Sequence, residues 1–114
     1  MVVVEMPEFA VTSRKLMDET ERMSLVLYLA FHPEAGDLIA GTGGVRKLRW
    51  ALEGRGKRGG ARVIYYFHSR RMPLFIITAY AKNVRDNLSE ADRNTMKALT
   101  KALAKYATKG PSHE

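Results

Sequence analysis

The stretch from residue 45 to residue 80 decides the fold, with VRKLRWAL at 45–52, ARVIYYF at 61–67 and LFIITAY at 74–80. The second and third segments are rich in β-branched and aromatic residues, and loops rich in glycine or basic residues separate the three. The first segment alternates between two faces, whereas the third is almost entirely apolar, as in a central strand. Because short connections join consecutive segments, the pattern predicts three neighbouring strands of an antiparallel meander.

Helical patterns lie on both sides of this stretch. Pro7 suits the first turn of a short helix, and residues 18–31 form a longer one that ends at His32–Pro33. The longer helix carries apolar residues at helical spacing: Met23, Val26, Leu27, Ala30 and Phe31. At the C-terminal end, Ser89 and Asp92 have the spacing of a capping box. The helix they begin has an apolar stripe through Leu88, Met96, Leu99, Leu103 and Tyr106, and a basic stripe through Arg93, Lys97, Lys101, Lys105 and Lys109.

The order of these elements predicts a single α+β domain over residues 1–114. Residues 2–5 are a short β-prone run, residues 34–45 are expected to form a loop, and residues 110–114 a frayed tail. With no cysteine, the chain has no disulfide, thiolate zinc site or cysteine nucleophile. The apolar runs are too short for a membrane span or a signal peptide, so we expect a soluble cytoplasmic protein.

The net charge of +7 is concentrated in one part of the chain. Residues 1–45 have three bases against seven acids, for a net charge of −4. Residues 46–85 have eleven bases and one acid, for +10, and residues 86–114 have five bases and four acids, for +1. Such a field attracts a polyanion, and nucleic acid is the obvious candidate. The alternative is a solvated basic face that has no partner.

Two glycine-rich loops invite comparison with phosphate-binding motifs. GTGG at 41–44 and GRGKRGG at 54–60 match neither the P-loop nor the dinucleotide fingerprint. In the second loop, backbone amides together with Arg55, Lys57 and Arg58 suit phosphate oxygens, although charge in a hairpin loop also serves solubility alone. The three histidines lack metal-ligand spacing, and no metal site is expected.

The strongest candidate site comes from the alternation of the strands. Lys47 and Arg49 point to one face of the first strand and Arg46 to the other. If Arg62 of the second strand shares the face of Lys47 and Arg49, a basic concave site results. Three residues follow the third strand and are placed to close its edge: Lys82, Asn83 and Arg85. Such a cluster lacks the usual acid–base groups, but it suits the stabilisation of charge on a phosphate, or plain RNA binding.

Three segments resemble the running pattern of the HigB-like branch of the RelE toxin superfamily. They read FHPEAGDLIAGTGGVRKLRW at 31–50, GRGKRGGARVIYYF at 54–67 and LFIITAYAKN at 74–83. The resemblance extends from about residue 8 to residue 105. It implies a RelE-like α+β fold, with N-terminal helices packed on a small antiparallel sheet and a C-terminal helix.

The resemblance also implies a function. Such a protein is the toxin of a type II toxin–antitoxin system and a metal-independent, cofactor-free endoribonuclease, or mRNA interferase. It cuts ribosome-bound mRNA by attack of a 2′-hydroxyl on the adjacent phosphate, and its antitoxin is usually a helix–turn–helix DNA-binding protein. The implied catalytic residues are Arg62, Lys47, Arg49 and Lys82. The implied RNA-binding residues are Lys57, Arg55, Arg58, Arg46, Asn83 and Arg85.

Several alternatives remain open at the level of sequence. A late tyrosine used by some members has no clear counterpart, since Ser89 lies in that region, so the general acid and base are unassigned. One alternative to the endoribonuclease is a non-catalytic toxin of the same fold that binds gyrase or RNA. Another is an inactive homologue. The antitoxin either covers the basic face or binds the helix over 18–31 and acts by its bulk.

Overall fold

The computed structural model of the chain describes residues 1–52, 60–85 and 87–109. Its elements in chain order are β1 (Val3–Glu5), α1 (Pro7–Leu16), α2 (Glu19–Phe31), β2 (Asp37–Leu38), β3 (Val45–Trp50), β4 (Ala61–Tyr66), β5 (Leu74–Ala81) and α3 (Glu90–Lys109). The predicted α+β class is confirmed, and so are the three strands and the helices that flank them. None of the described helices combines the length and apolarity of a membrane span.

The sheet has five strands in the order β1-β5-β4-β3-β2. The predicted meander is confirmed, because β3, β4 and β5 pair antiparallel to one another, and β2 also pairs antiparallel with β3. Two features differ from the expectation of a purely antiparallel sheet and a loop over 34–45. The β1 strand pairs with β5 in parallel, so the sheet is mixed, and the expected loop contains the two-residue strand β2. A strand this short leaves no periodicity to detect.

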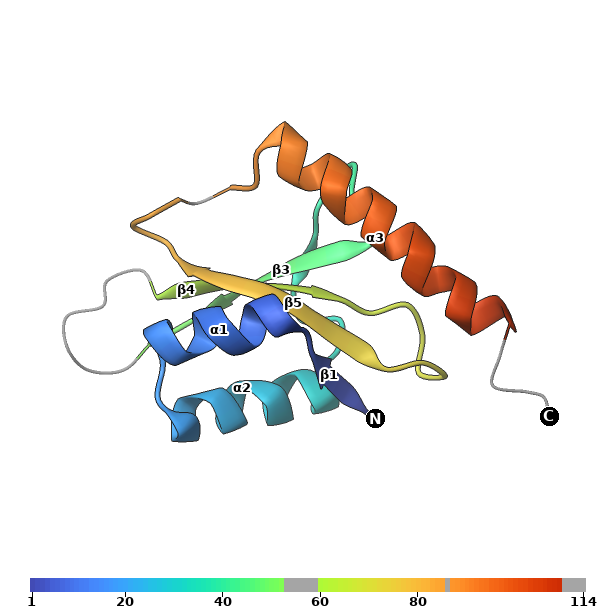
Figure 1. Cartoon of the computed structure of the whole chain (residues 1–114). Helices are drawn as coiled ribbons and strands as arrows, with labels where there is room; N and C mark the ends of the chain where they lie inside the picture. The colour runs from blue at the N-terminus through green and yellow to red at the C-terminus, as the bar shows by residue number, and fades with distance from the viewer. Residues whose placement is uncertain (53–59, 86, 110–114) are drawn as a thin grey trace.

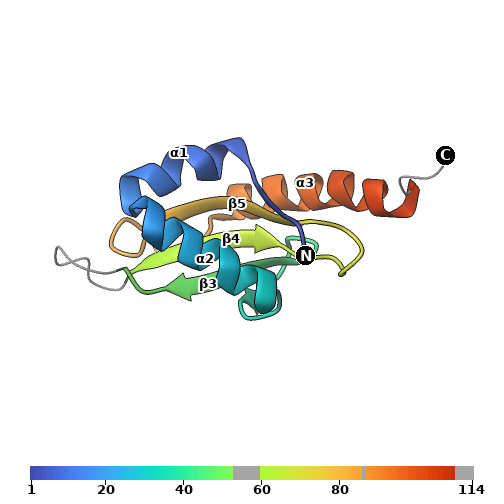
Figure 2. The same ribbon diagram turned by 90° about the horizontal axis from the view of Figure 1, so that it is seen from below.

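One face of the sheet is covered by α1 and α2, as Figure 1 shows. Phe9 and Met17, from α1 and its C-cap, and Leu25 and Leu29 from α2 pack on side chains of the middle strands and form a buried core with them. Tyr65 lies in this core, where its hydroxyl accepts a hydrogen bond from the backbone N–H of Gly36 and donates one to the Pro33 carbonyl, both at 2.8 Å. These bonds tie the segment after α2 to β4. Seen from below in Figure 2, α2 crosses in front of β3 and β4.

The opposite face is covered by α3 (Figure 1). Leu88 and Leu103 form a second core with Val45, Ile64 and sheet residues of the same face. The predicted capping box is confirmed: the Asp92 backbone N–H donates to Ser89 Oγ at 3.0 Å, and the Ser89 N–H donates to Asp92 Oδ2 at 3.2 Å.

The GTGG loop docks against α3. Thr42 is fully buried, and its carbonyl accepts a hydrogen bond from Thr100 Oγ1 at 2.8 Å. Gly43 adopts φ +78°, and a Cβ atom there would lie 2.4 Å from Thr100 Oγ1. The loop therefore requires glycine for both its conformation and its close approach to α3.

The buried face of α2 is not the one that the spacing of its apolar residues indicates. An Asp18–Glu21 capping box starts this helix, and Leu25 and Leu29 face the core. Met23, Leu27 and Phe31 are exposed instead. Apolar residues occupy almost the whole circumference between 23 and 31, so periodicity alone cannot select the packing face.

Candidate nucleic-acid interface

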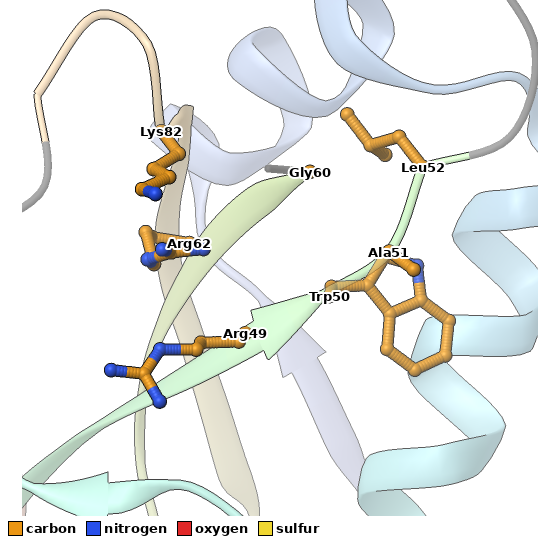
Figure 3. A pocket seen from close by; sticks show the side chains of 7 residues that line it. All are labelled: Arg49, Trp50, Ala51, Leu52, Gly60, Arg62 and Lys82. Atoms are coloured by element: carbon orange, nitrogen blue, oxygen red, sulfur yellow. The ribbon is translucent and has the colours of Figure 1, made fainter. Parts of the chain in front are cut away.

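The sheet register brings basic residues from three consecutive strand regions together. Arg49 of β3 lies directly opposite Arg62 of β4, and Arg62 lies opposite Tyr80 of β5. Lys82 follows the end of β5. Arg49, Arg62 and Lys82 line one shallow hollow of about 400 Å³. Figure 3 shows the three side chains in a row on the same side of the strands, with Trp50 turned the other way.

Gly60 fixes the position at which β4 begins. Its φ is +65°, and a Cβ atom there would lie 2.3 Å from the carbonyl oxygen of Trp50. The backbone N–H of Lys82 donates to the Gly60 carbonyl at 3.1 Å, which ties the end of β5 to the start of β4. Glycine at this position thus lets the strands approach closely enough for Arg49, Arg62 and Lys82 to share one hollow.

The three cations differ in exposure. Arg62 is only 4% exposed and lies toward the floor, whereas Arg49 and Lys82 are exposed. Arg62 Nη1 donates to the Ala61 carbonyl at 3.4 Å, within its own strand. Among the described residues that line the hollow there is no carboxylate and no imidazole. A nearly buried arginine flanked by two exposed cations makes the hollow positively charged, in a form that suits an anion.

Lys47 lies two residues before Arg49 on the same face of β3, but it lines a neighbouring hollow of about 280 Å³ rather than the first one. Its Nζ donates to Asn87 Oδ1 at 3.0 Å. Arg93, near the start of α3, lines this second hollow as well, and it also borders a third with Gly41. The positive surface therefore continues from Lys82 along the sheet to α3. The sequence placed Arg93 only in the basic stripe of this helix, because helical spacing does not show which turn lies near the sheet.

Arg85 has structural contacts of its own. Its guanidinium lies 4.5 Å from the centre of the Tyr80 ring, and its Nη1 lies 2.7 Å from Asp92 Oδ2. The Asp92 pKa is lowered, chiefly by the hydrogen bond from the Ser89 backbone, then by the Ser89 hydroxyl and by Arg85. Arg85 thus links the N-terminal cap of α3 to Tyr80, the cross-strand neighbour of Arg62. The sequence analysis missed Tyr80, because only the pairing register of β4 with β5 places it beside Arg62.

Arg46 is not brought into the hollow. It lies on the other face of β3, where its Nη1 donates to the carbonyls of Glu34 at 3.2 Å and Gly36 at 2.7 Å. The same alternation that groups Lys47 with Arg49 sends Arg46 to the α2 side of the sheet. Its contacts give it a structural role in holding the segment after α2.

The remaining predicted RNA-binding residues have different outcomes. Asn83 is exposed in the turn after β5, beside Lys82. Arg55, Lys57 and Arg58 lie outside the described residues. His68 follows the end of β4 opposite to the one that carries Arg62, and no described group of three His, Asp or Glu residues is arranged to hold a metal ion.

The fold and the hollow together define a small basic α+β protein with a positively charged face on its sheet. Comparison with protein families identifies the family to which this protein belongs. Residues 32–110 match the family described as the RelE toxin of the RelE / RelB toxin–antitoxin system, and the chain belongs to this family. The protein is therefore a toxin of a type II toxin–antitoxin system, and a cognate antitoxin is its partner.

Proposed function

We propose that the protein is an mRNA interferase of the HigB-like branch, a metal-independent endoribonuclease that cuts ribosome-bound mRNA in the cytoplasm. The observation that carries this proposal is the convergence of Arg49, Arg62 and Lys82 in one hollow on the uncovered part of the sheet. Three cations at a common point suit a single phosphate group and the charge that develops on it during reaction.

In the proposed reaction, the ribose 2′-hydroxyl attacks the adjacent phosphorus, and the bond to the 5′-oxygen of the next nucleotide breaks. The products are a 2′,3′-cyclic phosphate and a 5′-hydroxyl end. Arg62, held in place toward the floor of the hollow, binds the scissile phosphate, and Arg49 neutralises the additional charge of the transition state. Arginine keeps its proton in proteins, so any proton transfer by this cluster falls to Lys82 or Lys47.

The rest of the positive surface serves to place the substrate. Lys47 and Arg93 follow the hollow along the sheet, where they suit a neighbouring phosphate of the same strand. Asn83 is exposed in the turn beside Lys82, and Arg55, Lys57 and Arg58 add charge to the same block of sequence. Arg85 contributes by holding Tyr80 next to Arg62. The scarcity of acid–base groups in the described hollow is compatible with an enzyme whose substrate is oriented by the ribosome.

A non-catalytic toxin on this fold is the second candidate, and the same scarcity of acid–base groups favours it. One experiment separates the two. Inducible expression in a bacterium, followed by mapping of mRNA 5′ ends, is expected to show new 5′-hydroxyl ends within coding regions. A gyrase-binding toxin would leave mRNA intact and induce a DNA-damage response. A toxin that merely occupies RNA would arrest translation without new ends, and either result would overturn the proposed cleavage.

A further inference from the structure

A third hollow, at the start of α3, contains polar side chains that the proposed reaction does not use. It measures about 360 Å³ and is lined by Ala40, Gly41, Glu90, Arg93 and Asn94. One wall is the loop before β3 and the other is the first part of α3, and Figure 1 shows these two segments next to each other. Its volume falls within the range of small-molecule sites, roughly 300–1,000 Å³, and is sufficient for a nucleobase.

This third hollow is continuous with the cationic surface. Arg93 lines both the third hollow and the second one, which contains Lys47 and Asn87. An RNA strand with one phosphate in the first hollow and the next beside Lys47 and Arg93 therefore brings a neighbouring base to the third hollow.

The charge of the third hollow differs from that of the other two. Glu90 is exposed there, and a carboxylate repels phosphate but attracts N–H donors. Asn94 follows four residues later, so it lies on the same face of α3, and its amide both donates and accepts hydrogen bonds. Within the described part of the chain, neither side chain has a hydrogen-bond or ion partner. The hollow thus suits the polar edge of a base rather than the backbone of the strand.

The backbone at the start of α3 does not supply this site. The capping box already uses the Asp92 N–H, which donates to Ser89 Oγ, and the Asp92 carboxylate is paired with Arg85. Recognition therefore depends on the side chains of the helix. Across from them, a Cβ atom built on Gly41 would have no atom within 4 Å, so the loop wall leaves open space for a flat ring.

The donor and acceptor pattern of the bases selects among possible ligands. On its Watson–Crick edge, guanine has two adjacent N–H donors, at N1 and at the 2-amino group, which one carboxylate accepts together. The O6 acceptor on the same edge suits an amide donor. We propose that the third hollow binds a guanine base of the substrate strand beside the cut, with Glu90 accepting from N1 and N2 and Asn94 donating to O6. This inference rests on the proposed RNA substrate and adds a base preference to it.

The first test measures binding of the whole chain to short 2′-O-methyl oligonucleotides, which lack the attacking hydroxyl and are not cleaved. Three oligouridine strands carry a single guanine, inosine or adenine. Wild type is expected to bind the guanine strand about tenfold more tightly than the adenine strand, the size of one good base-edge contact. Inosine lacks the 2-amino group, so an intermediate affinity is expected. Equal affinity for the three strands would overturn the inference.

Glu90→Gln is the decisive variant, because it removes the charge and one acceptor at nearly constant size. The guanine preference is expected to fall below about twofold. Part of this fall comes from tighter binding of the adenine strand, since the carboxylate no longer repels phosphate. A misfolded variant would instead bind all strands more weakly. Asn94→Ala, which removes only the contact to O6, is expected to retain part of the preference.

Glu8→Gln is the matched control. Glu8 is also an exposed acid in the first turn of a helix, but it lies on α1, on the opposite side of the sheet. It is expected to keep the wild-type preference, and an equal loss in both variants would assign the effect to net charge and overturn the inference. Guanosine monophosphate is the competitor. If it binds as tightly as the guanine strand, the hollow is a site for a free nucleotide and the inference is wrong.

Mapped mRNA 5′ ends give a second readout. Wild type is expected to show guanine enriched at one fixed position beside the cut, and Glu90→Gln is expected to cut without this enrichment. If mRNA is cut with no preference that depends on Glu90, the guanine site is wrong and the proposed cleavage stands. If the oligonucleotides show a guanine preference that depends on Glu90 while mRNA stays intact, cleavage is wrong and the guanine site stands.

Discussion

The two faces of the sheet are completed in different ways. Under α1 and α2, the sheet packs into an apolar core, and the Tyr65 hydroxyl and the Arg46 guanidinium on this face bond to the segment after α2. Under α3 the sheet is covered only in part. Val45 at the start of β3 is buried in the core with α3, whereas Arg49 near its end is exposed in the hollow.

This difference has a physical reason. An arginine on a sheet face under a packed helix needs an ion partner, because a buried unpaired charge is costly. Where α3 does not cover the sheet, Arg49 stays hydrated and Arg62 keeps one side toward the hollow. The same architecture thus produces a scaffold face under α1 and α2 and a positively charged face beside α3.

The largest expected effect is on toxicity, from substitutions in the hollow. Arg62→Ala is expected to reduce mRNA cleavage by about 10²–10³-fold, as for loss of one group that stabilises transition-state charge. Arg62→Lys keeps the charge but loses the planar guanidinium, so an intermediate loss is expected. Growth after induction and counts of new mRNA ends measure both. Arg70→Ala, an exposed arginine outside the hollow, is the control and should remain fully toxic.

Because Arg62 is nearly buried, protein level and thermal unfolding must be compared alongside toxicity. Full toxicity of Arg62→Ala at normal protein level would contradict the phosphate-binding role. Arg49→Ala is the second variant, since Arg49 is exposed and its loss should not affect folding. If Arg62→Ala and Arg49→Ala both stay toxic, the RNA phosphate is bound elsewhere on the molecule.

On the scaffold face, Tyr65→Phe is expected to lower stability without changing the site. The change leaves the Gly36 N–H and the Pro33 carbonyl without their buried partner, at a cost of about 1–3 kcal/mol. Denaturant unfolding measures this cost. Toxicity per folded molecule should be unchanged, because the affected hydrogen bonds lie on the α2 side. Tyr66→Phe is the matching change on the α3 side of the sheet. Reduced toxicity of a soluble, folded Tyr65→Phe variant would contradict the prediction and show that the two faces are coupled.

The sequence predicted much of this fold because strong local signals agree. The segments 45–52, 61–67 and 74–80 became β3, β4 and β5 with small changes at their ends. What periodicity cannot supply is the partner and direction of a strand, and the parallel pairing of β1 with β5 followed from neither composition nor spacing. The periodicity of apolar residues also failed to select the packing face of α2.

The sequence predicted which side chains share a face of each strand, but not how neighbouring strands are aligned with one another. Alternation placed Lys47 and Arg49 on one face and Arg46 on the other, and the structure agrees. The pairing of Arg49 with Arg62 could only be stated as a condition, since a shift of one residue would separate them. Tyr80 and Arg93 were missed because they reach the site through cross-strand pairing and helix docking.

A smaller effect is expected on the salt dependence of RNA binding. Arg93→Ala should reduce the slope of log affinity against log salt by about one unit, if Arg93 neutralises one phosphate. Binding of a short single-stranded RNA across a salt series measures this slope. Lys15→Ala, an exposed lysine on α1, is the control and should leave the slope unchanged. Equal slopes for wild type and Arg93→Ala would restrict the interface to the first hollow.

The smallest effect concerns the cap that joins α3 to the hollow. The Ser89 backbone, the Ser89 hydroxyl and Arg85 lower the Asp92 pKa, so the ionised carboxylate stabilises the folded state. That contribution is complete above the ordinary carboxyl pKa of about 3.9 and disappears as the pH falls through the lower folded value. Since the pair is partly exposed, the expected loss is at most about 1 kcal/mol. An NMR titration of Asp92 should give a midpoint below 3.9, and Asp92→Asn should remove the loss of α3 stability between about pH 4 and pH 2. An Asp92 midpoint at or above the ordinary value would show that Ser89 and Arg85 do not stabilise the ionised carboxylate, and the predicted loss of stability at low pH would then be absent.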